Sequence, residues 1–118
     1  MEMRIVRRTD HFDAACRFWG ELLGCPVTHE WPEGDGQGRG RIFGVRADTG
    51  VELIETAGVP DVQGIFLSME VDDAGGLAAR LAEAGITVVS PLTDQPWGHR
   101  SITVQDPAGI EVSFWHRI

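Results

Sequence analysis

Hydrophobic residues near the start of the chain recur with the period of a helix. From Phe12 they recur three, four, seven, ten and eleven positions on, the spacing of one helix face packed on a core. The members of this stripe are Phe12, Ala15, Cys16, Trp19, Leu22 and Leu23. Thr9 and Asp10 precede this stretch as candidate capping residues, and Gly24 follows it as a stop. The pattern predicts a helix that begins near His11 and ends at Gly24.

Runs with a period of two predict strands around this helix, because alternation is typical of strands with one buried face. A second helix is predicted over residues 74–84, after the capping pair Asp72 and Asp73 and before Gly85. The expected strands cover residues 3–8, 25–31, 41–46, 51–56, 65–71, 86–90, 99–105 and 110–115.

The order of these elements occurs twice. Each half reads strand, helix, strand, strand, strand, and matching landmarks such as Gly24 and Gly85 lie about 60 positions apart. We expect one α+β domain over residues 1–118, with a first module at 1–57 and a second at 62–118. Two such modules predict a pseudo-symmetric body with a cleft between the sheets.

Composition and charge exclude several classes of partner and of catalysis. The 18 acidic and 10 basic residues give a formal net charge of −8, which argues against nucleic acid as a partner. No apolar run approaches the ~20 residues that span a bilayer, and the first residues do not resemble a secretory signal, so we expect a cytoplasmic protein without a membrane partner. The sequence has no Lys and no Tyr, which excludes Schiff-base and phenol-based catalysis.

Alternation also predicts which strand residues turn away from the helices. The expected cleft residues are Arg4, Val6, Glu52 and Ile54 in the first module and Phe66, Ser68, Glu70, His99, Ser101, Thr103, Glu111, Ser113 and Trp115 in the second. The glutamates of this set outnumber Arg4, and a cleft focuses that excess, which favours a cationic guest. Solvated glutamates at a rim are the alternative.

Aromatic residues add flat surface for stacking. Trp97, Trp115, Phe66 and Phe43 are expected to hold a flat basic molecule by stacking and cation–π contact. For Trp97, ligand contact and ordinary packing at a sheet edge are equally consistent with the sequence. The glycine-rich segment 34–40 precedes a strand rather than a helix, which favours a hairpin loop or a lid over a phosphate loop.

Three motifs resemble a known superfamily. Phe18–Gly24 (FWGELLG) resembles the helix end of the first module in the vicinal oxygen chelate fold of glyoxalase I, extradiol dioxygenases and bleomycin-resistance proteins. Asp106–Gly109 (DPAG) resembles the turn before the last strand. Gln95–Gly98 (QPWG), followed by Arg100, is similar to a segment of bleomycin-resistance proteins. The resemblance covers the chain and implies two βαβββ modules that form a cleft.

The resemblance also implies where enzymes of this fold hold a metal. Those positions correspond to Arg4, Glu52, Ile65 or Phe66, and Ser113, and of these only Glu52 binds divalent ions well. A zinc, iron or nickel site needs three or four converging donors. The four histidines are not spaced as ligand pairs either. We therefore expect no metal and no other cofactor.

The expected function is sequestration of a drug-like or natural-product ligand, without catalysis, by a homodimer similar to bleomycin-resistance proteins. The expected ligand-binding residues are Trp97, Glu52, Phe43, Phe66, His99, Ser113, Trp115 and Arg4. The alternative is a small-molecule enzyme of the same superfamily, an isomerase or lyase that is metal-independent or metal-dependent, with Glu52 as general base and His99 or Glu111 as acid. A sensor or accessory subunit is a third possibility that no residue distinguishes.

Overall fold

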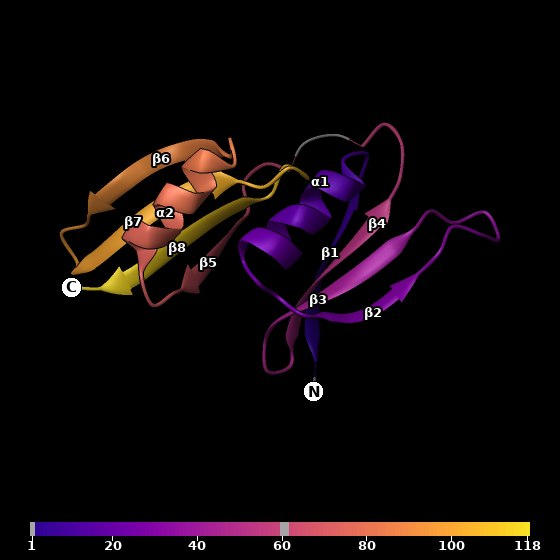
Figure 1. Ribbon diagram of the computed structural model, residues 1–118, viewed down its shortest axis with the longest axis horizontal. Helices are drawn as coiled ribbons and strands as arrows, with labels where there is room; N and C mark the ends of the chain where they lie inside the picture. Colours follow the sequence, from indigo (N-terminus) through magenta and orange to yellow (C-terminus); the bar gives the residue numbers. More distant parts are fainter. Residues whose placement is uncertain (1, 60–61) are drawn as a thin grey trace. The chain divides into compact units, whose positions relative to one another are not determined.

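Two four-stranded sheets, each with a helix against it, make up the fold (Figure 1). The computed structural model describes residues 2–59 and 62–118. In spatial order, the first sheet contains β1 (Met3–Thr9), β4 (Thr49–Glu55), β3 (Gly40–Arg46) and β2 (Val27–Trp31). The second contains β5 (Phe66–Glu70), β8 (Glu111–Arg117), β7 (His99–Gln105) and β6 (Thr87–Asp94).

The two sheets repeat one topology. In each, the first strand along the chain pairs in parallel with the last, and the remaining neighbours pair antiparallel. The chain divides into two compact units, unit one (Met1–Pro60) and unit two (Asp61–Ile118). The duplication predicted from the sequence is therefore present as two βαβββ modules in an α+β fold.

In unit one, β1 is followed by a short α-helix that continues directly as a π-helix. Helix α1 covers Phe12–Cys16 and continues as the π-helix η1 over Arg17–Leu22. The predicted start near His11 is one residue early, because His11 is the capping position. The hydroxyl of Thr9 accepts a hydrogen bond from the backbone N–H of His11 at 2.9 Å, so it stabilises the turn that leads into the helix.

The π-helix changes which side chains reach the core. The backbone N–H of Leu23 donates to the carbonyl of Phe18, five residues back, at 3.0 Å. The wider turn allows Phe18 and Trp19, adjacent in sequence, to be fully buried together, with ring centroids 5.3 Å apart. The predicted stripe assumed a period of 3.6 residues, and it therefore included Trp19 and omitted Phe18.

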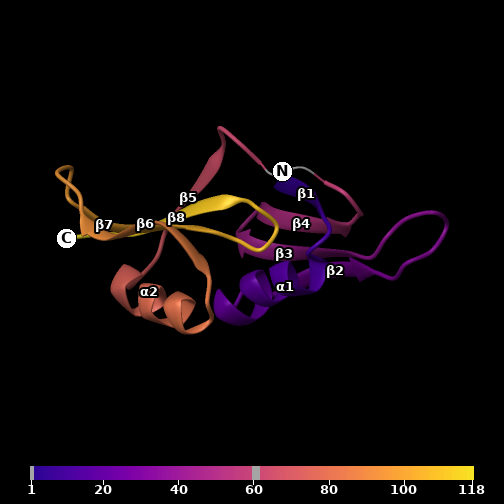
Figure 2. The same cartoon turned by 90° about the horizontal axis from the view of Figure 1, so that it is seen from above.

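Helix α2 (Ala74–Glu83) covers one face of the second sheet. The Asp73 carboxylate accepts a hydrogen bond from the backbone N–H of Gly76 at 3.0 Å, the bond expected of an N-cap. Leu77 and Leu81 are buried beneath the helix. Figure 2 shows α2 on one side of its own sheet, and α1 on one side of the sheet of unit one.

Each sheet therefore has a helix face and an opposite face, called here the open face. Residues paired directly across a ladder point to the same face. In unit two, Ile102 pairs with Phe114 and Val104 with Val112, and all four are buried on the helix face. The residues between them along each strand consequently point to the open face.

Strand β6 departs most from its predicted bounds. The predicted strand ends at Ser90, before Pro91, but β6 continues to Asp94. It lies at the edge of its sheet, where a residue without a backbone N–H, such as Pro91, is tolerated.

No helix in the described ranges, 2–59 and 62–118, is long and apolar enough to cross a membrane.

Candidate functional site

The open face of unit two gathers most of the predicted cleft residues. Ladder pairs place Phe66 beside Glu111, Ser68 beside Ser113 and Glu70 beside Trp115 on this face. His99, Ser101 and Thr103 of β7 share it, because they pair with Arg117, Trp115 and Ser113. The predicted direction of these side chains is confirmed, whereas their contact with a ligand stays a prediction.

Two contacts hold the indole of Trp115 in place. Its ring N–H donates to the hydroxyl of Ser68 at 2.9 Å. The imidazole of His99 stacks on the indole, with centroids 4.0 Å apart and planes only 4° from parallel. A flat surface fixed in this way needs little reordering when a guest arrives, which lowers the entropy cost of binding.

A cation and a carboxylate lie beside this ring. The guanidinium carbon of Arg117 is 5.4 Å from the indole centroid of Trp115, within cation–π range. The guanidinium also forms an ion pair with Glu70, at 3.5 Å between Nε and Oε2. The sequence analysis missed Arg117 because the predicted last strand ended at Trp115, whereas β8 continues to Arg117.

Trp97 lies in the turn between β6 and β7. The turn is closed by a hydrogen bond of 3.1 Å from the backbone N–H of Gly98 to the carbonyl of Gln95. Trp97 is 67% exposed, so its side chain is not packed into the core. The turn leads directly into His99, which pairs with Arg117, so the exposed indole belongs to the end of the sheet that carries these two residues.

In unit one, Arg4 and Glu52 meet on the open face. The guanidinium Nη1 of Arg4 lies 3.3 Å from the Glu52 carboxylate, whose side chain is only 14% exposed. Glu2 lies on the other side of the guanidinium, at 3.0 Å. The carboxylate proposed as a general base is therefore held in an ion pair.

Phe43 does not belong to the open face, and its prediction as a ligand-binding residue is wrong. It pairs with Val51 on the helix face and is 1% exposed. A Cβ placed on Gly20 of η1 would lie 2.9 Å from the Phe43 ring, which shows how closely the helix and the ring pack. Phe43 is a core residue of unit one, because the register of β3 on β4 sets it beside Val51.

The sequence analysis did not include Trp31 and His29 among the residues that turn away from the helices. They lie on the open face of unit one, with ring centroids 5.8 Å apart. The indole of Trp31 covers Gly40, at which any Cβ would overlap the ring. Gly40 could have indicated this contact from the sequence, since a glycine inside a strand often marks the close approach of another group.

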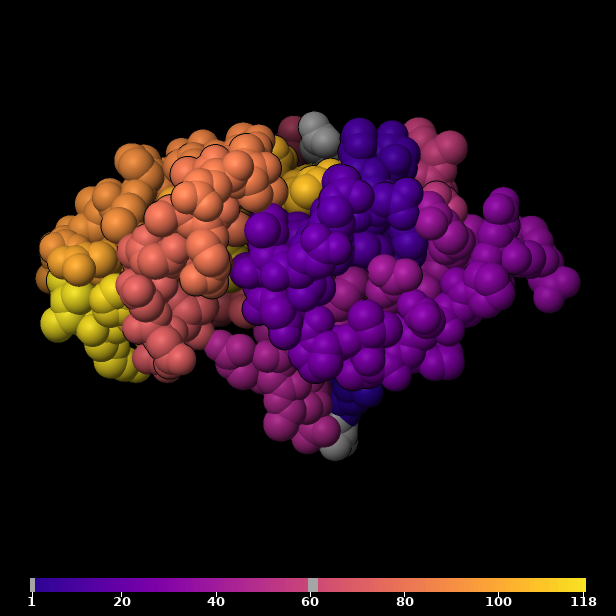
Figure 3. All heavy atoms as spheres, in the orientation of Figure 1, coloured from indigo at the N-terminus to yellow at the C-terminus, as the bar shows by residue number. Residues whose placement is uncertain are grey.

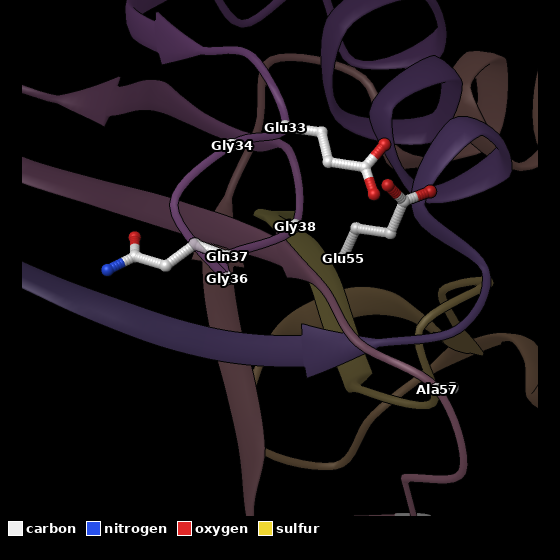
Figure 4. A pocket seen from close by; sticks show the side chains of 7 residues that line it. All are labelled: Glu33, Gly34, Gly36, Gln37, Gly38, Glu55 and Ala57. Carbon is white, nitrogen blue, oxygen red and sulfur yellow. The ribbon is translucent and has the colours of Figure 1, made fainter.

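The glycine-rich segment forms a loop between β2 and β3 that projects from unit one (Figure 3). A hollow of about 520 Å³ at its base is lined by Glu33, Gln37, Glu55 and the loop backbone. In Figure 4 the carboxylates of Glu33 and Glu55 turn toward each other. A second hollow, of about 420 Å³, lies beside Phe12 and Trp31. Neither hollow is lined by a predicted ligand-binding residue.

Arg39 ties this loop to the rest of unit one. Its guanidinium donates to Glu55 of β4 at 2.7 and 3.1 Å and to Asp13 of α1 at 3.0 and 3.3 Å. Its guanidinium carbon lies 4.7 Å from the centroid of the Phe12 ring. These hydrogen bonds hold the pKa of each of the two carboxyls below its usual value.

Arg39→Gln is expected to raise the pKa of Asp13 and Glu55 toward ordinary carboxyl values. A lowered pKa in the folded state stabilises the protein above the unfolded pKa, and this is lost as pH falls through the folded pKa. The stability difference between wild type and variant is therefore largest near neutral pH and shrinks below about pH 4. Carboxyl NMR titration and urea unfolding at several pH values measure both effects. A difference that grows in acid would contradict this assignment.

The two candidate acids of the enzyme alternative, His99 and Glu111, lie far apart in unit two. His99 pairs with Arg117 at one end of the ladder between β7 and β8, and Glu111 pairs with Gln105 at the other. The six-residue offset separates their backbones by about 20 Å. A small substrate that reaches one of these two candidate acids therefore does not reach the other, and their roles as alternative acids stay predictions.

Comparison with known families identifies the fold's relatives. The profile of the Glyoxalase/Bleomycin resistance protein/Dioxygenase superfamily matches residues 3–114. The chain belongs to this superfamily. No curated protein matches the chain closely enough to count as a relative.

Solved structures of the glyoxalase and bleomycin-resistance superfamily share the whole fold. TnmS3, an antibiotic binding protein from Streptomyces sp. CB03234, is 23% identical with a TM-score of 0.77, covering 100% of this chain and 96% of that one. TioX from Micromonospora sp. ML1 is 20% identical with a TM-score of 0.75, at 100% and 99% coverage. YycE from Bacillus subtilis, of unknown function, is 27% identical with a TM-score of 0.74, at 96% and 87% coverage.

The residues at the superfamily's metal-ligand positions do not fit a metal ion. Arg4 carries a positive charge at one of them and pairs with Glu52, the strongest donor of the set. Phe66 offers no donor atom, and the Ser113 hydroxyl is a weak ligand. Within residues 2–59 and 62–118, no three His, Cys, Asp or Glu side chains gather as a metal site.

Proposed function

We propose that this protein binds a flat, positively charged aromatic molecule on the open face of unit two and releases it chemically unchanged. The observation that carries the proposal is the Trp115 indole, which is fixed by Ser68 and His99 beside the Glu70 carboxylate. An aromatic face next to a carboxylate is the arrangement that attracts flat cations.

The surroundings of Trp115 support an aromatic guest. Phe66 is 60% exposed on the same face, and Trp97 is exposed at the end of the sheet where β7 begins. Exposed large aromatic side chains are costly in water and are enriched where proteins contact ligands. Ser113 and Thr103, paired across the ladder between β7 and β8, offer hydroxyls for orientation.

The charge of the protein supports a cationic guest. The formal net charge of −8 lowers the electrostatic potential around the molecule and favours the approach of cations. Arg4 and Glu52 form a polar pair within unit one, and their contact with a ligand stays a prediction. The cytoplasmic location and the homodimer also stay predictions, and light scattering on the purified chain measures the second.

The superfamily relationship supports binding rather than turnover. TnmS3 shares the fold over the whole chain and is described as an antibiotic binding protein. The residues at the superfamily's metal positions offer one strong donor, Glu52, whereas a zinc, iron or nickel site needs three or four. Sequestration of a drug-like or natural-product molecule requires only surface, shape and charge, which the open face supplies.

Calorimetric titration with three compounds that share one ring system tests the proposal. The cation 9-aminoacridine is expected to bind saturably and about tenfold more tightly than neutral acridone, because it adds cation–π and carboxylate contacts. The anion acridine-9-carboxylate is expected to bind weakest. A bleomycin serves as a larger cationic guest. Absence of saturable binding for every compound, or tightest binding of the anion, would overturn the proposed function.

A further inference from the structure

Arg117 occupies the position that a cationic guest needs. Its guanidinium lies 5.4 Å from the Trp115 centroid and 3.5 Å from the Glu70 carboxylate. These are the same two partners that the proposed function assigns to the guest. A ligand cation and the Arg117 guanidinium therefore compete for one aromatic surface and one carboxylate.

The arginine is held weakly enough to be displaced. The side chains of Arg117 and Glu70 are 73% and 56% exposed, so water and salt screen their ion pair. Arg117 is the last residue of β8. Swinging the side chain into solvent breaks these exposed contacts and leaves the backbone ladder intact.

The geometry also restricts the shape of the replacing cation. His99 covers one face of the indole with a parallel ring at 4.0 Å, so a guest that stacks on Trp115 must use the other face. A planar guanidinium or amidinium can lie over that face and still direct its N–H groups at the Glu70 carboxylate. An ammonium group is compact and strongly hydrated, so it fits this arrangement less well.

We propose that Arg117 is a built-in competitor that sets the specificity of the site for planar guanidinium or amidinium groups carried on an aromatic ring. The inference rests on the proposed function and names its ligand class. The guest replaces Arg117 over Trp115 and against Glu70, and the freed arginine side chain moves into solvent.

Benzamidine and benzylamine test this assignment, because they differ only in carrying a planar or a tetrahedral cation on the same ring. The readout is the indole N–H signal of Trp115 in a ¹H–¹⁵N spectrum, identified by its loss in Trp115→Phe. Benzamidine is expected to shift this signal at lower concentration than benzylamine. Arg117→Gln is expected to tighten benzamidine binding about fivefold, the effect of removing one exposed cation–π contact and one surface ion pair.

Two further variants separate displacement from a general change of charge. Arg80→Gln removes the same charge from α2, on the helix side of the sheet, and is expected to leave the benzamidine affinity unchanged. Arg117→Gln combined with Glu70→Gln is expected to lose the gain, since the carboxylate partner is then missing. Thermal melts of each variant, followed by circular dichroism, show whether the fold is retained.

Three results would overturn the inference. They are equal or weaker benzamidine binding by Arg117→Gln, an equal gain from Arg80→Gln, and a Trp115 signal that benzamidine never shifts in wild type or variant. Saturable binding of 9-aminoacridine alongside any of these results would leave the proposed function standing. Failure of the acridine series as well would remove both.

Discussion

Trp115→Ala is expected to weaken binding of a flat cationic guest by at least about thirtyfold. Aromatic residues at the centre of a binding surface commonly contribute about 2 kcal/mol or more when truncated, which corresponds to that factor. The substitution removes the stacking surface, and it leaves the His99 ring without its partner at 4.0 Å. Calorimetric titration of 9-aminoacridine into wild type and variant measures the change.

Two control variants show whether the loss of affinity comes from the indole of Trp115. Trp115→Phe keeps a flat ring but removes the hydrogen bond of 2.9 Å to Ser68, so an intermediate loss of several-fold is expected. Trp31→Ala removes the same side chain from the open face of unit one and is expected to change affinity by less than about threefold. Unchanged binding by Trp115→Ala, or a larger loss for Trp31→Ala, would place the site elsewhere.

Phe43→Ala and Phe66→Ala are expected to have opposite consequences. Phe43 is 1% exposed beneath η1, and its truncation is expected to lower the free energy of unfolding by about 3–5 kcal/mol. Phe66 is 60% exposed, so its truncation is expected to cost less than about 1 kcal/mol of stability. The same change at Phe66 is expected to weaken guest binding about fivefold to tenfold, because it removes apolar contact area.

Urea unfolding of both variants measures the effect on stability, and calorimetric titration measures the effect on binding. Phe43→Ala that still folds at low temperature is expected to bind 9-aminoacridine as wild type does, because its side chain does not reach the open face. A stable Phe43→Ala variant that has lost binding would return Phe43 to the site. A strongly destabilised Phe66→Ala variant would instead make Phe66 a structural residue.

Local patterns were sufficient to predict the architecture and most side-chain directions. Strand β7 has the predicted bounds, and β8 begins one residue after its predicted start, because alternation is a property of the strand itself. Gly24 and Gly85 both adopt positive φ, as expected of residues that end helices. The duplicated order of elements predicted the duplicated topology. These features depend on neighbouring residues, which the sequence displays directly.

Features set by pairing between distant segments could not be predicted in this way. Phe43 lies in the core because the register of β3 on β4 sets it beside Val51, and no local pattern fixes that register. Phe18 is buried because η1 is a π-helix, which a search for a period of 3.6 overlooks. Arg117 was omitted because the length of β8 is decided by its partner strands.

The ion pairs also revise the charge of the site. The sequence analysis set Arg4 alone against Glu52, Glu70 and Glu111, but the structure adds Arg117, which pairs with Glu70. The preference for a cation therefore depends less on net charge than the sequence implies. It depends more on the Trp115 ring and on how readily Arg117 leaves it.

The indole N–H region of a ¹H–¹⁵N spectrum, recorded during titration with 9-aminoacridine, tests the central claim most directly. The chain has 4 tryptophans, and they report on different places: Trp19 in the core of unit one, Trp31 on its open face, Trp97 in the turn before β7, and Trp115 on the open face of unit two. The Trp115 signal is expected to shift most, the Trp97 signal less, and the Trp19 signal not at all. Saturation of the protein with a stationary Trp115 signal, or shifts confined to Trp31, would contradict the account.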